Sequence, residues 1–199
     1  MTPSWNLKLI TPPEVEPVSL DEAKAHLYVT IDDDDALIQR LIRAARESAE
    51  LYTRRAFVTQ TWEVAYESLL VPMLELPKPP LQAVEAIEYT DDEGNPQTIP
   101  PTDYVVDTFV EPAIVYRARA AGWPVLTAPG SRARIRFRAG YVGDGSPGTG
   151  AENVPALVKQ AILLHVGAMY ENRHDAAAMP MACENLLHQV RVYGWGECC

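Results

Sequence analysis

Residues 155–173, with the sequence PALVKQAILLHVGAMYENR, form the longest apolar stretch of the chain that suits a helix. Pro155 fits the first turn, where a missing backbone N–H removes no hydrogen bond and a fixed φ favours the helix. Apolar side chains surround almost the whole predicted cylinder, with interruptions at Lys159, Gln160 and His165. A helix that is apolar on nearly all sides is typically buried, and the charged and polar interruptions disfavour a membrane span. We therefore expect a core helix.

A short helix is predicted near the N-terminus. Ser19 and Glu22 match a capping box, in which the serine hydroxyl accepts from a first-turn amide and the glutamate accepts from the cap N–H. The helix should continue to about residue 28. Before it, prolines at positions 3, 12, 13 and 17 exclude a helix from residues 1–17, which we expect to form an extended arm on the surface.

An amphipathic helix is predicted from about residue 34 to 54, because apolar residues recur every three or four positions. The opposite face carries charges that include Arg43 and Glu50, and we expect them to be mostly exposed. The run Asp32–Asp35 precedes this helix. Four acids suit the positive end of a helix dipole, and they lack the alternation and the glycine of a calcium loop, so a metal site is the weaker interpretation.

The middle of the chain is predicted to be rich in β-strands. From residue 58 to 66 the polarity alternates with a period of two, as a half-exposed strand requires. The clearest strand is 133–139, where small and apolar residues alternate with arginines. Further strands are expected at 83–89, 97–99, 104–108 and 114–117, and the first two of these should form a hairpin across 91–95.

Charge is unevenly distributed along this β-rich block. Acids dominate residues 57–111, where Lys78 is the one base, whereas arginine is the only charged residue type from 112 to 142. Three arginines share one face of the clearest strand. They are Arg134, Arg136 and Arg138. This basic face either pairs with acids of the same sheet or meets the acidic face of a neighbouring subunit, and a phosphate site is weaker because no phosphate cradle lies nearby.

The C-terminal part contains a glycine-rich segment and a short apolar stretch. Residues 143–150, GDGSPGTG, suggest a flexible connector rather than a phosphate-binding loop, because no Gly-Lys-Ser/Thr follows. Residues 184–193 suit a short helix. We expect a partner-docking tail whose contact residues are Leu186, Leu187, Val190, Tyr193 and Trp195. Large aromatic residues often anchor interfaces, although a frayed terminus is the alternative.

Composition excludes several classes of protein. The net charge of −10 argues against a general nucleic-acid binder, which would need a cationic surface. The three cysteines, Cys183, Cys198 and Cys199, crowd the C-terminus and make a poor disulfide framework, so a reducing compartment is expected. No charged segment followed by an apolar segment opens the chain, and we expect no signal peptide.

Motifs for chemistry are not found in the sequence. The four histidines, His26, His165, His174 and His188, have no partner at metal-ligand spacing, and His165 is expected to be a core histidine. No nucleophile elbow, zinc-protease motif or dinucleotide fingerprint is present. The sequence therefore predicts no enzyme activity, no cofactor and no metal.

The order of these elements resembles the head–tail connector proteins of tailed phages, the gp6-like and gp8-like adaptor family that also occurs in gene transfer agents. The resemblance covers about residues 18–173. It is carried by VSLDEAKAHLYV, by DDDDALIQRLIRAARESAELYTRRAF, by TQTWE and ELPKPPLQAV, by RIRFRAGY and by VPALVKQAILLHVGAMYENR.

The resemblance implies a structural role without enzyme activity. Such adaptors form a ring, commonly of twelve copies, beneath the portal and extend the DNA channel towards the tail. The implied partners are other copies of the chain, the portal protein and a tail-side stopper or terminator protein. DNA would pass without sequence-specific binding, no membrane is involved, and a negative channel would repel the DNA. The implied location is the neck of a virion or phage-like particle assembled in the bacterial cytoplasm.

Together these features predict an α+β protein with a helical scaffold and a β-rich insertion. The scaffold has two N-terminal helices and a long buried C-terminal helix. The expected divisions are an arm at 1–17, a helical core at 18–56 and 152–182, a β-rich insertion at 57–142, a flexible loop at 143–151 and a tail at 183–199. The alternatives are a tail-terminator or tail-completion ring protein and a small metal-dependent enzyme with its site at Asp32–Asp35.

Overall fold

The computed structural model describes residues 5–71, 73–91, 93–119, 122–126, 131–141, 151–172 and 178–193. It has helices and antiparallel sheets, so the predicted mixed α+β class is confirmed. The chain divides into two compact units. The β unit comprises Met1–Pro12 and Thr59–Gly140, and the helical unit comprises Pro13–Val58 and Tyr141–Cys199.

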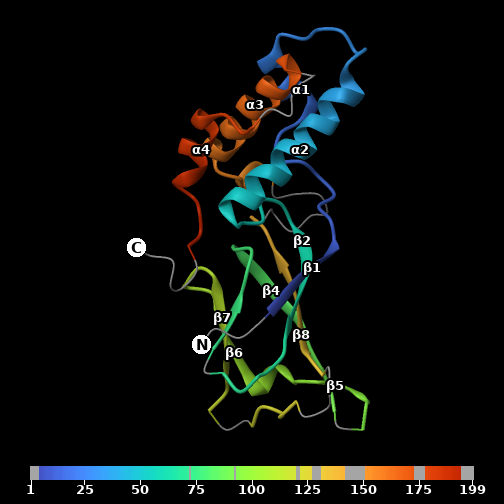
Figure 1. The fold of residues 1–199 in the computed structure, drawn as a ribbon, viewed down its shortest axis with the longest axis vertical. Coiled ribbons are helices and arrows are strands. Elements are labelled where there is room, and N and C mark those ends of the chain that lie inside the picture. Colours follow the sequence, from blue (N-terminus) through green and yellow to red (C-terminus); the bar gives the residue numbers. More distant parts are fainter. Residues whose placement is uncertain are drawn as a thin grey trace. The chain divides into compact units, whose positions relative to one another are not determined.

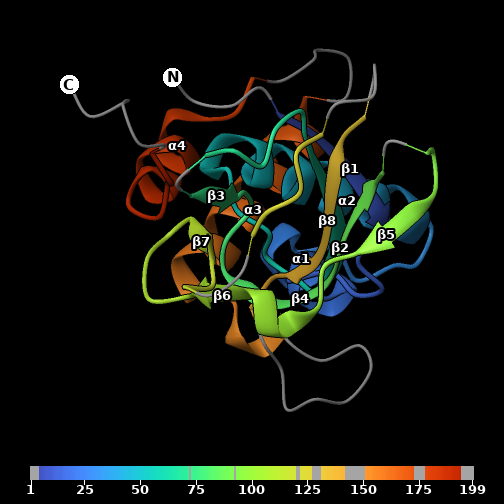
Figure 2. The ribbon, with the colours of Figure 1, turned by 90° about the horizontal axis from the view of Figure 1, so that it is seen from below.

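The larger sheet of the β unit is five-stranded and antiparallel, in the order β1-β2-β8-β4-β5 (Figure 1). Its strands are β1 (Trp5–Thr11), β2 (Gln60–Tyr66), β4 (Leu81–Thr90), β5 (Pro96–Thr98) and β8 (Ala133–Ala139). β8 lies between β2 and β4, as Figure 2 also shows. The predicted strand 133–139 is confirmed at both ends. Its alternation is also confirmed, because the small and apolar side chains are buried and the arginines are exposed.

The smaller sheet of the β unit is three-stranded, in the order β3-β7-β6. Its strands are β3 (Leu74–Leu76), β6 (Tyr104–Asp107), which follows the 3₁₀ turn Pro101–Asp103, and β7 (Ala113–Arg117). Its buried residues include Leu74, Leu76, Ile114 and Val115. In the larger sheet, the predicted hairpin is confirmed by the pairing of β4 with β5.

The turn of that hairpin is fixed by one aspartate and one glycine. The Asp91 carboxylate accepts from the backbone amides of Glu93 and Asn95 at 3.0 and 2.8 Å. Gly94 has φ +87°, a left-handed conformation that glycine adopts without steric cost. The residues around 91–95 thus determine locally where the chain reverses direction between β4 and β5.

The N-terminal arm contains a strand that the sequence analysis did not predict. Trp5–Thr11 is extended, as expected, and it pairs with β2 as an edge strand of the larger sheet. Most of β1 is exposed in the single chain, including Trp5 and Leu9. Exposure on both faces explains why no alternating pattern identified it.

The helical unit contains α1 (Leu20–Leu27), α2 (Asp35–Thr53), α3 (Ala156–Glu171) and α4 (Met181–His188). A 3₁₀ turn at Ala151–Asn153 precedes α3. The core of this unit is apolar and includes Ala23, Ile38, Ile42, Ala45, Val158, Ile162, Val166 and Leu187. The capping box of α1 is confirmed: Glu22 N–H donates to Ser19 Oγ at 3.1 Å, and Ser19 N–H donates to Glu22 Oε2 at 2.7 Å.

The long apolar helix α3 is less buried than its composition predicts. α3 packs against α1, α2 and α4, and this contact buries residues such as Val158 and Ile162. Leu157, Leu163 and Leu164 are only half-buried in the single chain. The expectation of a helix buried on all sides is therefore wrong for one copy, because these neighbours do not enclose the whole cylinder.

No helix in the described part of the chain is long and apolar enough to cross a membrane. Most of the predicted flexible loop 143–151 lies outside the described residues.

Candidate interaction surfaces

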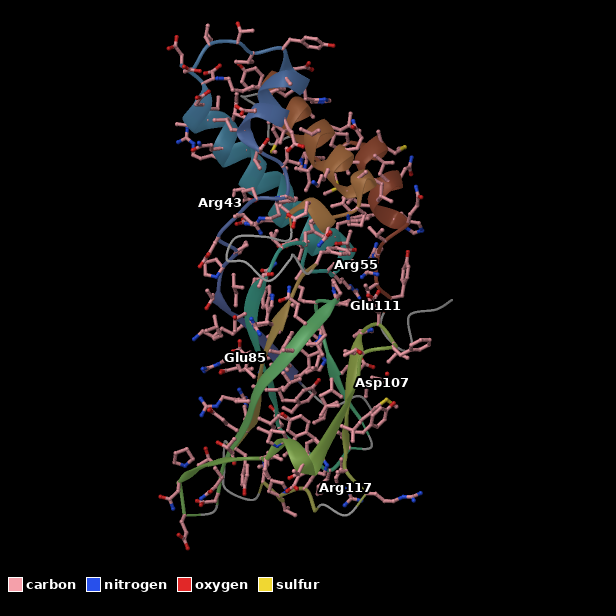
Figure 3. The ribbon with its side chains drawn as sticks, turned by 180° about the vertical axis from the view of Figure 1, so that it is seen from behind. Arg43, Arg55, Glu85, Asp107, Glu111 and Arg117 are labelled. Atoms are coloured by element: carbon pink, nitrogen blue, oxygen red, sulfur yellow. The ribbon has the colours of Figure 1, made fainter. Side chains whose placement is uncertain are left out.

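The arginines of β8 lie in the middle of the larger sheet, and acids of both neighbouring strands reach two of them. Arg136 Nη2 is 3.1 Å from Glu63 Oε2 on β2. Arg138 Nε is 3.2 Å from Glu85 Oε1 on β4, a residue labelled in Figure 3. Just before β8, Arg132 Nη2 is 3.4 Å from Glu67 Oε1. Part of the charge segregation is therefore accounted for by pairing within one sheet.

These pairs leave a basic surface exposed. The side chains of Arg136 and Arg138 are 44% and 49% exposed, and Arg134 is also exposed. Exposed ion pairs of this kind contribute about 0–1 kcal/mol each to the stability of the fold, so acids of a neighbouring subunit could replace Glu63 and Glu85 at little cost. The face defined by Arg134, Arg136 and Arg138 stays a predicted intersubunit face.

Side chains of α1 and α3 contact the aspartates at the start of α2. Lys24 Nζ lies 2.6 Å from Asp32 Oδ1 and 2.7 Å from Asp35 Oδ1. The hydrogen bond to Asp32 raises the pKa of Lys24, and the same contact lowers the pKa of Asp32. Tyr170 Oη donates to Asp34 Oδ2 at 2.5 Å. These contacts give the run a structural explanation, since they tie the start of α2 to α1 and α3.

Among the described residues, no group of three or more histidine, cysteine, aspartate or glutamate side chains is arranged to hold a metal ion. His165 is buried within α3, where the sequence placed a core histidine. His26 of α1 lies beside Gly167 of α3, whose added Cβ would sit 3.6 Å from His26 Nε2. His174 lies outside the described residues.

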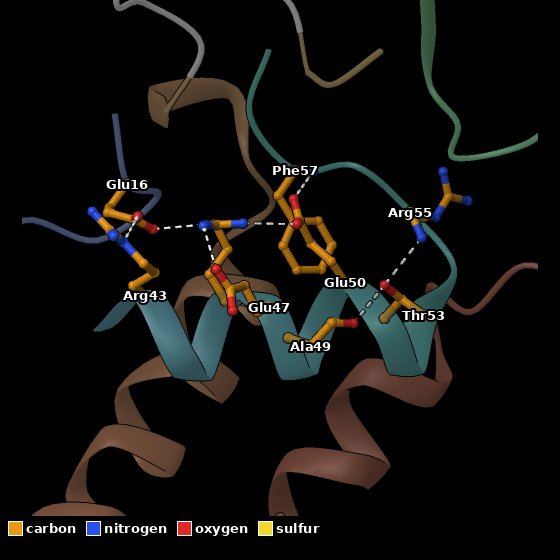
Figure 4. Close-up of polar contacts among 9 residues, drawn as sticks. Glu16, Arg43, Glu47, Ala49, Glu50, Thr53, Arg55 and Phe57 are labelled. Atoms are coloured by element: carbon orange, nitrogen blue, oxygen red, sulfur yellow. Dashed lines mark hydrogen bonds and ion pairs between the residues drawn. The ribbon is translucent and has the colours of Figure 1, made fainter. Parts of the chain in front are cut away.

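A buried ion network stabilises the helical unit, and the sequence analysis missed it. Arg46 Nη1 is 2.9 Å from Glu50 Oε2, and Arg46 Nε is 2.7 Å from Glu16 Oε2 (Figure 4). Glu50 Oε1 accepts from the backbone amide of Phe57 at 2.8 Å. Burial alone would lower the pKa of Arg46, but the hydrogen bond to Glu16 and the nearby carboxylates raise it. The expectation that Glu50 is exposed is wrong, because its partners satisfy the buried charge.

The predicted docking tail begins inside the helical core. Leu187 of α4 is 1% exposed, Cys183 is fully buried, and burial raises the pKa of the Cys183 thiol. Leu186 and Val190 are partly buried and pack against the same core. Leu187 therefore cannot contact a partner in the folded unit. The apolar spacing that suggested a docking face is the spacing of a core face, and the two cannot be told apart from one sequence.

The chain after α4 is held to the end of α2. Val192 N–H donates to Thr53 O at 2.9 Å, and Arg55 Nε donates to Val190 O at 2.5 Å. The Arg191 guanidinium stacks 5.0 Å from the Tyr52 ring and 5.5 Å from the Tyr193 ring. Tyr193 is 39% exposed, so its contact with a partner stays a prediction. Trp195, Cys198 and Cys199 lie outside the described residues.

Exposed apolar side chains on the helical unit form surfaces that sequence reasoning did not identify. Tyr28, directly after α1, is 93% exposed, and Ile31 in the following loop is 58% exposed. Leu51 on α2 is 78% exposed. Isolated apolar residues of this kind form no pattern in the sequence, so only the structure shows that they are exposed.

A segment of the sequence and the fold of the chain are similar to those of phage structural proteins. Residues 17–95 match the family model described as phage gp6-like head-tail connector protein. The matched segment contains the capping box, α1, α2 and the strands β2 to β4. The resemblance predicted from the order of elements is thereby confirmed.

Solved structures of phage-like particles contain chains with the same fold. A chain of a native gene transfer agent (GTA) virion is 25% identical, with a TM-score of 0.76 over 94% of this chain and 97% of that chain. A chain from the neck of a native GTA particle, computed with C12 symmetry, is 26% identical, with a TM-score of 0.70 over 95% and 98%. A chain from the neck of an empty GTA particle, computed with C6 symmetry, is 24% identical, with a TM-score of 0.75 over 95% and 98%. Among curated proteins the comparison finds no match.

Proposed function

We propose that this protein is a head–tail connector of a phage or gene transfer agent, which forms a ring in the particle neck and joins the head to the tail. The observation that carries this function is the coverage of the neck and virion chains: the fold extends over 94–95% of this chain and 97–98% of theirs. The family match over residues 17–95 independently supports the same role.

The ring would contact a portal protein on the head side and a stopper or terminator protein on the tail side. Twelve copies agree with the C12 symmetry of one similar neck. The net charge of −10 supports a channel that repels DNA and lets it pass without sequence-specific binding. Assembly would take place in the bacterial cytoplasm, and the protein would have no catalytic role.

The helical unit would be the scaffold of the connector, and the Thr59–Gly140 part of the β unit would be an insertion between α2 and α3. The capping box and the ion network of Arg46 support this division, because they hold α1, α2 and their flanking segments together within the helical unit. The face of Arg134, Arg136 and Arg138 would contribute to contacts between copies, and Tyr193 with Trp195 would contact a neighbouring neck protein.

The test is the mass of the purified protein in solution, measured by light scattering alone and after mixing with its portal protein. The expected result is a closed ring or a stable complex with the portal. The connector function would be contradicted by a protein that stays monomeric and does not bind the portal, at concentrations where the portal itself is assembled.

A further inference from the structure

Tyr28 has a conformation and an exposure that folding does not explain. It ends α1 in the left-handed region, at φ 57° and ψ 32°, and its backbone N–H caps the helix. Glycine or asparagine normally occupies this position, because a Cβ is sterically unfavourable in the left-handed conformation. The Tyr28 side chain is 93% exposed, so packing does not offset that cost. The tyrosine side chain therefore makes no contribution to the core of the helical unit, and a role in binding would explain its presence.

The loop that follows Tyr28 is held firmly in place. We call residues 28–34 the α1–α2 loop. Its far end is tied down by Lys24, which pairs with Asp32 at 2.6 Å, and by the hydrogen bond from Tyr170 to Asp34. Near its start, Val29 packs against the core of the helical unit and its N–H donates to Lys24 O at 3.0 Å. The contacts therefore fix the backbone on both sides of the loop tip.

A fixed loop that exposes apolar side chains is suited to binding. Tyr28 and Ile31 expose two large apolar groups, and the contacts described above hold the loop backbone on both sides of its tip. Ordering in advance lowers the entropic cost of association, and tyrosine is among the residues enriched at the centres of interfaces. Asp32 and Asp33 flank the tip, so a fitting partner should be apolar in the middle and basic at the rim.

The same helical unit carries such a surface on α2. Exposed residues recur along α2 at helical spacing, and we call six of them, including the C-cap residue Arg54, the α2 stripe. They are Arg40, Arg43, Ala44, Glu47, Leu51 and Arg54. Leu51 is 78% exposed, Arg43 is 72% exposed in its side chain, and arginine is the prevailing charge of the stripe. Apart from Glu47, the charged residues of the stripe are arginines, and they complement the acid-flanked tip of the loop.

Tyr28 of the loop and Leu51 of the stripe cannot meet within one copy. Asp35, where α2 begins, and Leu51 are about 24 Å apart along the helix, at a rise of about 1.5 Å per residue. The two surfaces lie at different places on the unit, so their contact would join different patches of two copies. A contact of this type repeats from copy to copy and generates rings or filaments.

We infer that the α1–α2 loop of one copy packs on the α2 stripe of the next copy, with Tyr28 and Ile31 against Leu51 and Ala44, and with Asp32 and Asp33 facing Arg40 and Arg43. The partner is a second copy of this chain. The inference rests on the proposed ring, and it names the residues that close it.

Cross-linking between the two surfaces tests the contact in the assembled protein. Full-length chains carrying Cys198→Ser and Cys199→Ser would receive Tyr28→Cys and Leu51→Cys, together or singly, and would be treated with a short bismaleimide. The expected result is a ladder of covalent oligomers only when both cysteines are present and rings have formed. The matched controls are the two single-cysteine chains, which should give no ladder.

A glycine substitution separates binding from folding. Tyr28→Gly removes the anchor and also suits the left-handed backbone, so thermal stability should be unchanged or higher. The protein concentration needed for half-assembly should rise by about tenfold or more. An unstable Tyr28→Gly variant that fails to assemble would contradict this account of the residue. A stable Tyr28→Gly variant that assembles normally would also contradict it.

The outcomes also distinguish this contact from the ring itself. Rings that form normally, with no ladder from the Tyr28→Cys and Leu51→Cys pair, would overturn the inference and leave the connector function intact. Rings of Tyr28→Gly that assemble normally but no longer bind the portal would overturn it too, because the loop would then be a portal contact. Failure of the unsubstituted protein to form rings, alone or with the portal, would contradict the proposed function.

Discussion

Arg46 and Glu50 lie one helical turn apart on α2 and form an ion pair at 2.9 Å, although both side chains are buried. Their other partners come from outside the helix: Glu16 precedes α1, and Phe57 follows α2. The network therefore joins three segments of the helical unit that are separated in sequence. A buried charge is tolerated only when it is paired and hydrogen-bonded, so each partner depends on the others.

Replacing Arg46 with alanine should destabilise the protein by about 3–5 kcal/mol, because Glu50 and Glu16 would lose their counter-charge in a buried position. The free energy of unfolding from urea titration is the measurement. Arg43→Ala is the matched control on the same helix. Arg43 lies 3.9 Å from Glu16 and is largely exposed, so its loss should change stability by less than about 0.5 kcal/mol. Equal effects of the two substitutions would argue against a role for the buried network.

Leu187→Ala should cost about 2–5 kcal/mol, since α4 places this side chain in the core of the helical unit. Met181→Ala, at an exposed position of the same helix, is the control and should change stability little. Thermal unfolding of both variants measures the difference. For the same reason, ending the chain at residue 182 should prevent the helical unit from folding, whereas ending it after Tyr193 should not. A stable fold without residues 183–199 would show that α4 is dispensable.

Local patterns predicted much of the fold. The capping box at Ser19, the alternation of β8 and the hairpin around Asp91 depend on residues close in sequence, so local patterns are enough to predict each of them. The sequence does not predict the buried pair of Arg46 and Glu50, because a helical pattern places such charges on the outer face. Only the approach of Glu16 and the Phe57 amide makes their burial possible, and these are tertiary contacts.

The candidate surfaces were predicted less well for a related reason. The spacing of Leu187 is the same for a core helix and for a docking helix, and only burial separates them. Tyr28 and Leu51 belong to no apolar pattern in the sequence, and their exposure follows only from the structure. The arginines of β8 were recognised as one face, but their acidic partners on β2 and β4 follow from strand order, which the sequence does not specify.

The capping box should make stability depend on pH. The backbone amide of Ser19 holds the pKa of Glu22 below its ordinary value of 4.5. A lowered pKa in the folded state adds stability that is present above pH 4.5 and is lost as the pH falls through the folded value. Glu22→Ala should therefore be less stable than the unsubstituted protein at pH 7, and the difference should shrink near pH 3. Ser19→Ala should cost about 1 kcal/mol at pH 7. Urea titrations at the two pH values measure both effects, and a difference for Glu22→Ala that does not change with pH would exclude this linkage.

Gly167→Ala should stabilise the protein by up to about 1 kcal/mol, because alanine favours the interior of α3. An added Cβ would meet His26 Nε2 at 3.6 Å, an ordinary van der Waals distance. The expected rise in Tm is about 2–4 °C. Gly94→Ala is the control: no atom lies within 4 Å of its added Cβ, but φ is +87°, so strain should lower the Tm. A lower Tm for Gly167→Ala would mean that α1 cannot accommodate even a methyl group here.

Reversing the arginines of β8 tests the predicted intersubunit face. The triple variant Arg134→Glu, Arg136→Glu and Arg138→Glu should weaken ring assembly far more than it weakens folding, because the exposed pairs with Glu63 and Glu85 each contribute at most about 1 kcal/mol. Light scattering measures assembly, and urea titration measures the stability of the single chain. A control with Arg117→Glu and Arg119→Glu reverses exposed charges elsewhere in the β unit and should assemble normally. If the triple variant forms rings as well as this control does, the arginines serve only their own sheet, and contacts between copies must come from other surfaces such as the α1–α2 loop.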